Sequence, residues 1–171
     1  MKVLIADNHT LFREGFSSQL QRFDVLNELQ EIKDFAAMKI LAGDKKEFDV
    51  VFVDRDILGT EWKDGFKAVK EMFPQARVVM LSESEDQRDI LDAFDMQAAG
   101  YITKTSGDSL IINALRLIMD GNTYVPRHAP PRAGRKPHFV PHAARRQKSD
   151  FPPKRSASAF KQRIVQQTNR L

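Results

Sequence analysis

The chain contains no cysteine, which excludes disulfides, thiolate metal sites and cysteine nucleophiles. It also lacks long apolar runs, since none approaches the roughly 18 residues that a membrane-spanning helix needs. The first apolar stretch, Val3–Ala6, is too short for the core of a signal peptide. We therefore expect a soluble protein of the cytoplasm.

Proline is almost absent from the first 125 residues, and acidic residues are almost absent from the rest. Pro74 is the one proline of eight in residues 1–125, a segment with 15 basic and 22 acidic residues and a net charge of −7. Residues 126–171 hold 12 basic residues and a single acid, Asp150, for a net charge of +11. A segment so rich in proline and charge lacks the apolar residues for a packed core. We expect a globular domain over residues 1–125 and a basic, proline-rich, disordered tail over residues 126–171.

Short apolar runs alternate with amphipathic segments in the first 125 residues. The expected strands are Val3–Ala6, Val25–Leu29, Val50–Val53, Val78–Leu81 and Gly100–Thr103. The segments between them carry apolar residues at helical spacing. Ser84 and Gln87 form a capping-box pattern, and Gly121 is placed to end the last helix. Strand and helix alternate five times, which predicts a doubly wound α/β domain with a parallel sheet.

Polar side chains follow the ends of four expected strands: Asp7, Asp54, Ser82 and Lys104. Because ligands bind at the carboxyl ends of the strands in open parallel sheets, these side chains should meet at one edge. Together they suit phosphoryl transfer to a carboxylate. Asp54 would be the nucleophile, and Asp7 would help to hold Mg²⁺ through oxygen ligands. Ser82 would hydrogen-bond a phosphoryl oxygen, and Lys104 would offset the charge of the attached group.

Each of these residues also has an ordinary structural explanation. Asp7 and the following Asn8 could cap a helix, and Ser82 could cap its own turn. Lys104 could simply be solvated. The four side-chain types at four strand ends together favour a shared site over four separate explanations.

Four segments of the sequence resemble receiver domains in the NarL/LuxR branch of response regulators. They are KVLIADNHTLFREG at residues 2–15, FDVVFVD at 48–54, ARVVMLS at 76–82 and GYITK at 100–104. The motifs follow one another in the order and spacing of the family, and the resemblance extends over residues 1–125.

The resemblance implies a flavodoxin-like fold with a five-stranded parallel sheet of order 2-1-3-4-5. It also implies that a sensor histidine kinase phosphorylates Asp54 in a Mg²⁺-dependent reaction, with transcription regulation as the output. Tyr101 would be the aromatic switch, whose ring moves when Ser82 is drawn toward the phosphoryl group. A homodimer is a further expected partner, and the chain is not expected to be a dedicated enzyme.

Three residues near Asp54 depart from the family pattern. The family has a second acidic metal ligand where this chain has Asn8, and the neutral amide should weaken Mg²⁺ binding. Asp56 adds an acid where the family contributes mainly a backbone carbonyl, so the expected metal-binding set is Asp7, Asn8, Asp54 and Asp56. Glu83 stands where a small or apolar residue is usual and could repel a phosphodonor. These changes leave open a phosphate-independent pseudo-receiver that acts as an interaction module.

Residues 126–171 do not resemble the helix-turn-helix module that follows receivers of this branch, because they lack its apolar periodicity. A second hypothesis is nucleic-acid binding through this basic tail. Such binding would be weak and non-specific, since unstructured basic side chains neutralise phosphates without reading bases. A third hypothesis is a phosphatase, because Asp54-Arg55-Asp56 matches the Asp-x-Asp motif of haloacid-dehalogenase-type enzymes. In those enzymes, however, the motif follows the first strand and not the third.

Overall fold

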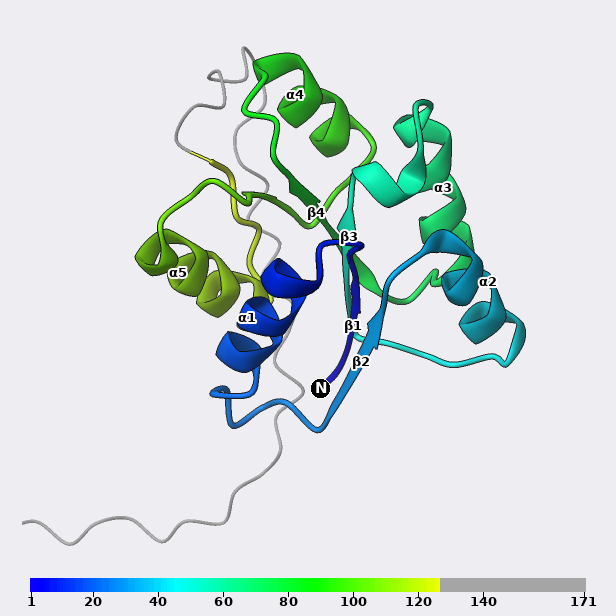
Figure 1. Ribbon diagram of the computed structural model, residues 1–171, viewed down its shortest axis with the longest axis horizontal. Helices are drawn as coiled ribbons and strands as arrows, with labels where there is room; N and C mark the ends of the chain where they lie inside the picture. Colours follow the sequence, from blue (N-terminus) through cyan, green and yellow to red (C-terminus); the bar gives the residue numbers. More distant parts are fainter. Residues whose placement is uncertain (127–171) are drawn as a thin grey trace, which may run out of the picture. The chain divides into compact units, whose positions relative to one another are not determined.

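The computed structural model describes residues 1–126 of the chain, and the expectations for residues 127–171 lie outside the described residues. Strands and helices alternate along the described part (Figure 1). In chain order they are β1 Lys2–Ala6, α1 Thr10–Leu20, β2 Glu28–Ile32, α2 Phe35–Gly43, β3 Val50–Asp54, the short 3-10 helix η1 Asp56–Leu58, α3 Trp62–Met72, β4 Arg77–Ser82, α4 Gln87–Asp95, β5 Gly100–Thr103 and α5 Asp108–Met119. Within residues 1–126, no helix is long and apolar enough to cross a bilayer.

The five strands form one parallel sheet of order β2-β1-β3-β4-β5, which confirms the predicted topology. The middle strand, β3, is buried along its whole length. Continuous apolar runs suit such a strand because helices cover both of its faces. The order of the sheet changes direction at β1 and β3, so the carboxyl ends of these two strands form the crevice where ligands bind in this fold.

Helices cover both faces of the sheet. One layer, on the left in Figure 1, consists of α1 and α5, which pack Phe16, Leu20 and Leu115 against the sheet. The other layer consists of α2, α3 and α4, with Met38 and Phe66 among its buried side chains. The strands contribute alternate residues to the two layers, so the core is divided by the sheet into two apolar clusters.

The second strand lies three residues later than the sequence analysis predicted. It covers Glu28–Ile32, and its pairing with β1 begins with Glu28 opposite Lys2. Val25 instead belongs to the preceding turn, where its carbonyl accepts a 2.7 Å hydrogen bond from the amino terminus of Met1. An edge strand needs few buried apolar residues, so the apolar pattern marked its start poorly.

The predicted capping box at α4 is also wrong, whereas the predicted end of α5 is confirmed. The N-cap of α4 is Asp86, whose carboxylate accepts a hydrogen bond from the Arg88 backbone N–H. At the other helix, Gly121 has a φ of 86°, the left-handed conformation that glycine adopts most easily. Hydrogen bonds from Gly121 N–H to the Ile118 carbonyl and from Asn122 N–H to the Leu117 carbonyl complete a Schellman motif.

The segment after α5 returns to the sheet. The Tyr101 backbone N–H donates a 3.2 Å hydrogen bond to the Tyr124 carbonyl, beside a bridge between Gly100 and Tyr124. The Arg77 guanidinium donates hydrogen bonds to the carbonyls of Ile118 and Asn122. These contacts fix the end of α5 and the following residues onto β4 and β5.

Candidate functional site

The carboxyl ends of the strands bring the predicted side chains to one edge of the sheet. Asp54 and Ser82 are the last residues of β3 and β4, while Asp7 follows β1 and Lys104 follows β5. Parallel-sheet hydrogen bonding continues past the strand ends, from Asp7 N–H to the Ile32 carbonyl at 3.1 Å and from Lys104 N–H to the Ser82 carbonyl at 2.8 Å. The backbone therefore holds these residues in position before any side-chain contact is counted.

The Lys104 ammonium bridges the two carboxylates. Its Nζ lies 2.8 Å from Asp7 Oδ2 and 3.0 Å from Asp54 Oδ2. All three side chains are at least 95% buried, so these ion pairs are poorly screened by solvent. Asp7 Oδ2 and Asp54 Oδ2 accept no hydrogen bond from the described residues, and Lys104 offsets their charge by ion pairing instead.

Burial raises the pKa of the Asp54 carboxyl above its ordinary value, because desolvation disfavours the charged form. The ion pair with Lys104 opposes this shift in the pKa, while the negative charges of Asp7 and Asp56 add to it. Asp54 is therefore a carboxylate whose charge is costly in the resting protein. A divalent cation beside it would relieve that cost.

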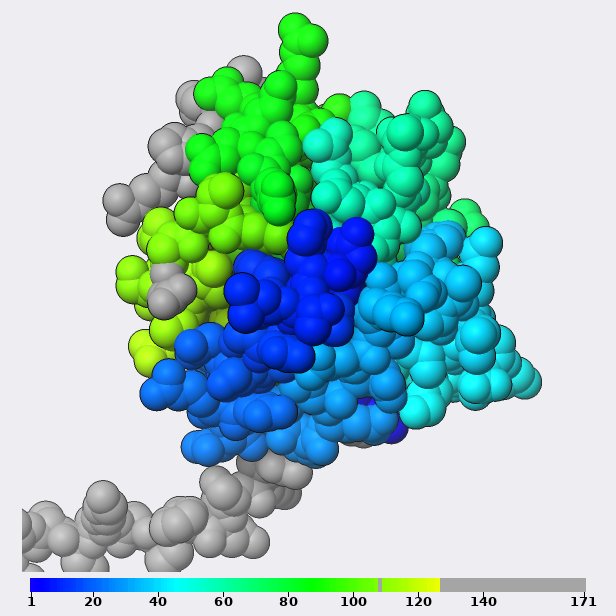
Figure 2. Space-filling view, in the orientation of Figure 1, coloured from blue at the N-terminus to red at the C-terminus, as the bar shows by residue number. Residues whose placement is uncertain are grey.

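His9 belongs to the same cluster, and the sequence analysis did not identify it as a site residue. It is the N-cap of α1, and its backbone N–H donates a 2.7 Å hydrogen bond to Asp7 Oδ1. The ring atom Nδ1 lies 3.4 Å from Asp7 Oδ1, 3.6 Å from Asp54 Oδ2 and 3.1 Å from Lys104 Nζ. The Asp7-x-His9 spacing at the end of a strand was the available sequence signal. Figure 2 shows this dark-blue N-terminal segment between the green and cyan segments of the surface.

Ser82 and Tyr101 lie on the β4 and β5 side of the site. The Ser82 hydroxyl accepts a 3.0 Å hydrogen bond from the Ser84 backbone N–H. Tyr101 is buried, and its hydroxyl donates a 2.8 Å hydrogen bond to the Ser84 carbonyl. Burial also raises the pKa of the Tyr101 hydroxyl. Both residues therefore contact the same turn, which links β4 to α4.

Three further residues proposed from the sequence lie at the exposed rim of the site. Asn8 is exposed between β1 and α1, and Asp56 is exposed at the start of η1. Glu83 is exposed as well, but its Oε1 lies 3.9 Å from Nε2 of His9. Asp56 acts on Asp54 through its charge.

The arrangement suits a divalent cation. Asp7, His9 and Asp54 each offer one ligand atom, and these atoms lie within 4.8 Å of one another. Two of the groups are buried carboxylates with an oxygen that accepts no hydrogen bond from the described residues. Carboxylate oxygens are ligands that Mg²⁺ prefers, so the residues present fit this ion.

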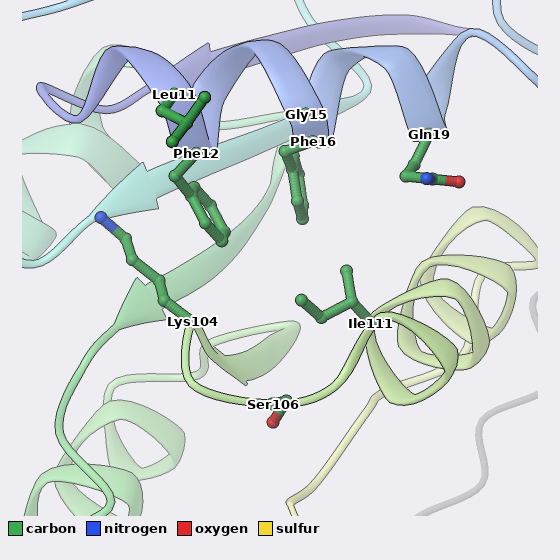
Figure 3. A pocket seen from close by; sticks show the side chains of 8 residues that line it. All are labelled: Leu11, Phe12, Gly15, Phe16, Gln19, Lys104, Ser106 and Ile111. Atoms are coloured by element: carbon green, nitrogen blue, oxygen red, sulfur yellow. The ribbon is translucent and has the colours of Figure 1, made fainter.

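A pocket of about 270 Å³ opens next to the site, between α1 and α5 (Figure 3). The aliphatic stem of Lys104 lines it, and the amino group extends past Phe12 toward the strand ends. Lys104 Nζ lies 5.0 Å from the centre of the Phe12 ring, within range of a cation–π contact. The pocket wall thus helps to direct the ammonium toward the two carboxylates.

The family model of the response regulator receiver domain matches residues 3–116. The glycerol metabolism activator of Pseudomonas putida is 31% identical over 125 residues, which cover 73% of this chain and 57% of that protein. The oxygen regulatory protein NreC of Staphylococcus carnosus is 30% identical over 129 residues, which cover 73% of this chain and 58% of that protein. The chain therefore spans less than 60% of the length of these two relatives.

Solved structures show the same fold. The isolated receiver domain of RcsB from Salmonella enterica serovar Typhimurium superposes with a TM-score of 0.66 at 21% identity, over 75% of this chain and 94% of that one. A LuxR family DNA-binding response regulator from Silicibacter pomeroyi gives a TM-score of 0.63 at 22% identity, over 74% and 98% of the two chains. Because the family model covers well over half of the sequence, and the relatives are regulators of the NarL/LuxR type, the chain belongs to the response regulator receiver family.

Proposed function

We propose that the chain is a two-component receiver in which Asp54 accepts a phosphoryl group from a sensor histidine kinase in the presence of Mg²⁺. The proposal rests on the Lys104 ammonium, which bridges the buried carboxylates of Asp7 and Asp54 at the strand ends. Residues 1–125 would form the receiver and residues 126–171 a separate basic tail. The switch would act in transcription regulation, as in relatives named as transcriptional regulatory proteins.

In the transfer step, a carboxylate oxygen of Asp54 forms a bond to phosphorus as the bond from phosphorus to the histidine nitrogen of the kinase breaks. The released imidazole keeps its electron pair and takes up a proton. Asp7 and Asp54, with Asn8 and Asp56 at the rim, would hold Mg²⁺, which when bound would offset the charge of the phosphoryl oxygens. Lys104 already lies 3.0 Å from the acceptor carboxylate and is placed to pair with the attached group.

The conformational change that follows phosphorylation would pass through the turn that links β4 to α4. The Ser82 hydroxyl accepts a hydrogen bond from Ser84 N–H, and it would donate its own proton to a phosphoryl oxygen. A shift of Ser82 toward Asp54 would pull on Ser84, whose carbonyl holds the Tyr101 hydroxyl at 2.8 Å. Loss of that hydrogen bond would allow the Tyr101 ring to move, and the surface around α4 and β5 would change for a partner protein.

A homodimer is part of this proposal. Leu11 on α1 is 87% exposed and lines the pocket between α1 and α5. A second copy of the chain would cover this apolar surface, and sedimentation velocity before and after phosphorylation measures the association.

The test of phosphorylation is incubation of the full chain with Mg²⁺ and acetyl phosphate, followed by intact mass measurement. We expect one phosphoryl group per chain in the wild type and none in Asp54→Asn. Asp44→Asn is the matched control, because Asp44 is an exposed residue at the end of α2. Labelling that survives in Asp54→Asn would remove the assignment of the acceptor.

The phosphate-independent pseudo-receiver is a second candidate function. Its supporting observation is that Lys104 already offsets part of the charge of the two carboxylates, while Asn8 contributes no charge to the metal site. Under this alternative the wild type remains unlabelled at saturating Mg²⁺ and acetyl phosphate. The same mass measurement therefore separates the two candidates.

A further inference from the structure

Ser84 connects the turn between β4 and α4 to three parts of the molecule. Its backbone N–H donates a 3.0 Å hydrogen bond to Ser82 Oγ, and its carbonyl accepts a 2.8 Å hydrogen bond from the Tyr101 hydroxyl. Its own hydroxyl donates a 2.7 Å hydrogen bond to Asp89 Oδ2 on α4. The backbone of Ser84 therefore contacts both residues that are proposed to move, while its side chain is bound to a third residue that the proposed function does not use.

The Asp89 carboxylate is bound in turn by Arg55, the residue that follows Asp54. Arg55 Nη1 lies 3.2 Å from Asp89 Oδ2, and Nη2 donates a longer, 3.4 Å hydrogen bond to Asp89 Oδ1. Two parallel contacts of this kind define the relative orientation of the side chains more closely than one contact does. The two side chains are 32% and 18% exposed, so solvent screens this pair less than it screens an ion pair on the surface.

Arg55 is held at both its backbone and its side chain. Its N–H donates a 2.9 Å hydrogen bond to the Leu81 carbonyl of β4, one residue beyond the end of β3. Its guanidinium carbon lies 5.6 Å from the centre of the ring of Trp62, a buried residue at the start of α3, within range of a cation–π contact. Asp89, and through it Ser84, is therefore attached to the end of the central strand of the sheet.

We propose that Arg55 and Asp89 are positioning residues that hold this turn in its resting conformation and thereby limit the rate at which Asp54 is phosphorylated. The consequence for phosphorylation rests on the proposed function. A shift of Ser82 toward the acceptor moves the Ser84 backbone and stretches the hydrogen bond from Ser84 to Asp89. The arrangement that is competent for phosphorylation is then a minor population of the resting chain, and a substitution that breaks the contact enlarges this population.

The positioning role has to be separated from two other effects of these charges. Asp89 also lies in the first turn of α4, where a negative charge stabilises the helix. In addition, charges near the acceptor act on the approach of an anionic phosphodonor. That electrostatic effect alone would make Asp89→Asn faster and Arg55→Gln slower, whereas loss of the positioning contact makes both variants faster.

Three substitutions break the connection at different points and change the charge in different ways. Ser84→Ala leaves the charge unchanged, Asp89→Asn removes a negative charge, and Arg55→Gln removes a positive charge. We expect each of them to raise the rate of labelling by acetyl phosphate and Mg²⁺ about three- to tenfold, as for the loss of one partly exposed charged hydrogen bond. Intact mass measurement over a time course gives these rates.

Asp92→Asn is the matched control. It removes the same charge from the same helix, but the Asp92 carboxylate lies 2.5 Å from Lys63 Nζ and belongs to a separate ion pair. We expect this variant to be labelled at the rate of the wild type. The double variant Arg55→Gln with Asp89→Asn should be no faster than the faster of its two single variants, because both substitutions break the same contact.

Tyr101 reports the resting state of the turn without any phosphodonor. The full chain has two tyrosines, so with ¹³C-labelled tyrosine rings the variant Tyr124→Phe assigns the resonances of Tyr101. We expect the three substitutions to move the Tyr101 ring resonances along one common line, toward the position that Mg²⁺ and beryllofluoride produce. Asp92→Asn should leave them in place. A substitution that merely loosened α4 would not move this ring in the same direction as the phosphoryl mimic.

Rates that follow the charge, with Asp89→Asn faster and Arg55→Gln slower, would overturn the inference. Tyr101 resonances that stay in place, or that move in unrelated directions, would overturn it as well. Because these resonances are recorded without a phosphodonor, an unlabelled wild type would remove the proposed function while Tyr101 still decides whether the two residues hold the turn. Conversely, labelling of Asp54 at equal rates in all variants would leave the proposed function intact and remove only the role of Arg55 and Asp89.

Discussion

Asp54 has a carboxyl group that is buried at the end of β3. Its pKa is raised, chiefly by desolvation, so the folded chain binds a proton at this carboxyl more tightly than the unfolded chain does. The folded state therefore loses stability from this group as the pH rises from its ordinary pKa of 3.8 through the raised value. Above that window the ionised carboxylate is a net cost to the folded protein.

We expect Asp54→Asn to raise the melting temperature of the metal-free protein by a few degrees at neutral pH. The gain should shrink as the pH is lowered toward 3.8, because the wild-type carboxyl then becomes neutral too. Differential scanning calorimetry over a pH series with a chelator present measures this. Asp44→Asn, on the exposed end of α2, should show no such trend. A lower melting temperature for Asp54→Asn at neutral pH would contradict the account.

The charge of the residues around the metal position should control the affinity for Mg²⁺. We expect Asn8→Asp to strengthen Mg²⁺ binding because it restores a charged ligand, and Asp56→Asn to weaken it. Trp62 is the single tryptophan of the chain and lines a second pocket together with Asp56, so its fluorescence offers the titration signal. Equal midpoints for both variants and the wild type would show that neither position contributes to the ion.

The residues at the strand ends could be predicted because an apolar run followed by a polar residue is visible in the sequence itself. Asp7, Asp54 and Lys104 each stand directly at the end of an apolar run, and the parallel sheet brings such ends together. His9 was not identified because its place beside Asp7 depends on local backbone geometry, in which the His9 N–H donates a hydrogen bond to Asp7 Oδ1. The position of Glu83 opposite that ring could not be predicted, since it depends on side chains from two separate loops.

At the scale of elements, the packing of α3 on η1 positions the loop that follows Asp54. A Cβ atom added to Gly65 would lie 2.8 Å from Leu58 Cβ and 2.9 Å from the Leu58 carbonyl oxygen. Because the Leu58 backbone cannot shift as easily as the end of a flexible side chain, we expect Gly65→Ala to destabilise the protein by about 1–3 kcal/mol. Chemical denaturation with urea measures the change.

Gly15→Ala is the matched control for this prediction. Gly15 is exposed within α1, and an added Cβ atom would have no neighbour within 4 Å. Alanine favours a helix interior over glycine by about 1 kcal/mol, so this substitution should stabilise the chain. If both variants shifted stability in the same direction, close contact between α3 and η1 would not be the cause at Gly65.

The sequence identified the central strands more accurately than the edge of the sheet. β3 and β4 are apolar runs buried on both faces, and their predicted limits differ from the observed ones by one residue at most. β2 includes Glu28, Gln30 and Glu31 and buries only Ile32, so no apolar run marks it. Its position follows from hydrogen bonding to β1, which a sequence pattern does not report.

At the scale of the whole molecule, the charge is divided between the receiver and the residues that follow it. We expect the full chain to bind DNA duplexes only through residues 126–171, with an affinity that falls steeply as salt rises and shows no sequence preference. A chain that ends at Val125 should fold, accept a phosphoryl group and lose this binding. Pro126 is buried, so a chain that ends at Pro126 is the control that shows whether loss of this residue alone destabilises the fold.

Fluorescence anisotropy with two unrelated duplexes over a salt series, together with thermal melts of the shortened chains, tests this expectation. Preference for one duplex at physiological salt would show that residues 126–171 recognise specific base sequences. A shortened chain that fails to fold would place the domain boundary later.

The hydrogen bond between the Tyr101 N–H and the Tyr124 carbonyl joins β5 to the last residues that the structure describes. Tyr101 carries the ring proposed to move, and Tyr124 lies two residues before Pro126, the last described residue. If the Tyr101 ring moves on phosphorylation as proposed, the residue that carries it is hydrogen-bonded through its own backbone to Tyr124, close to the end of the described residues.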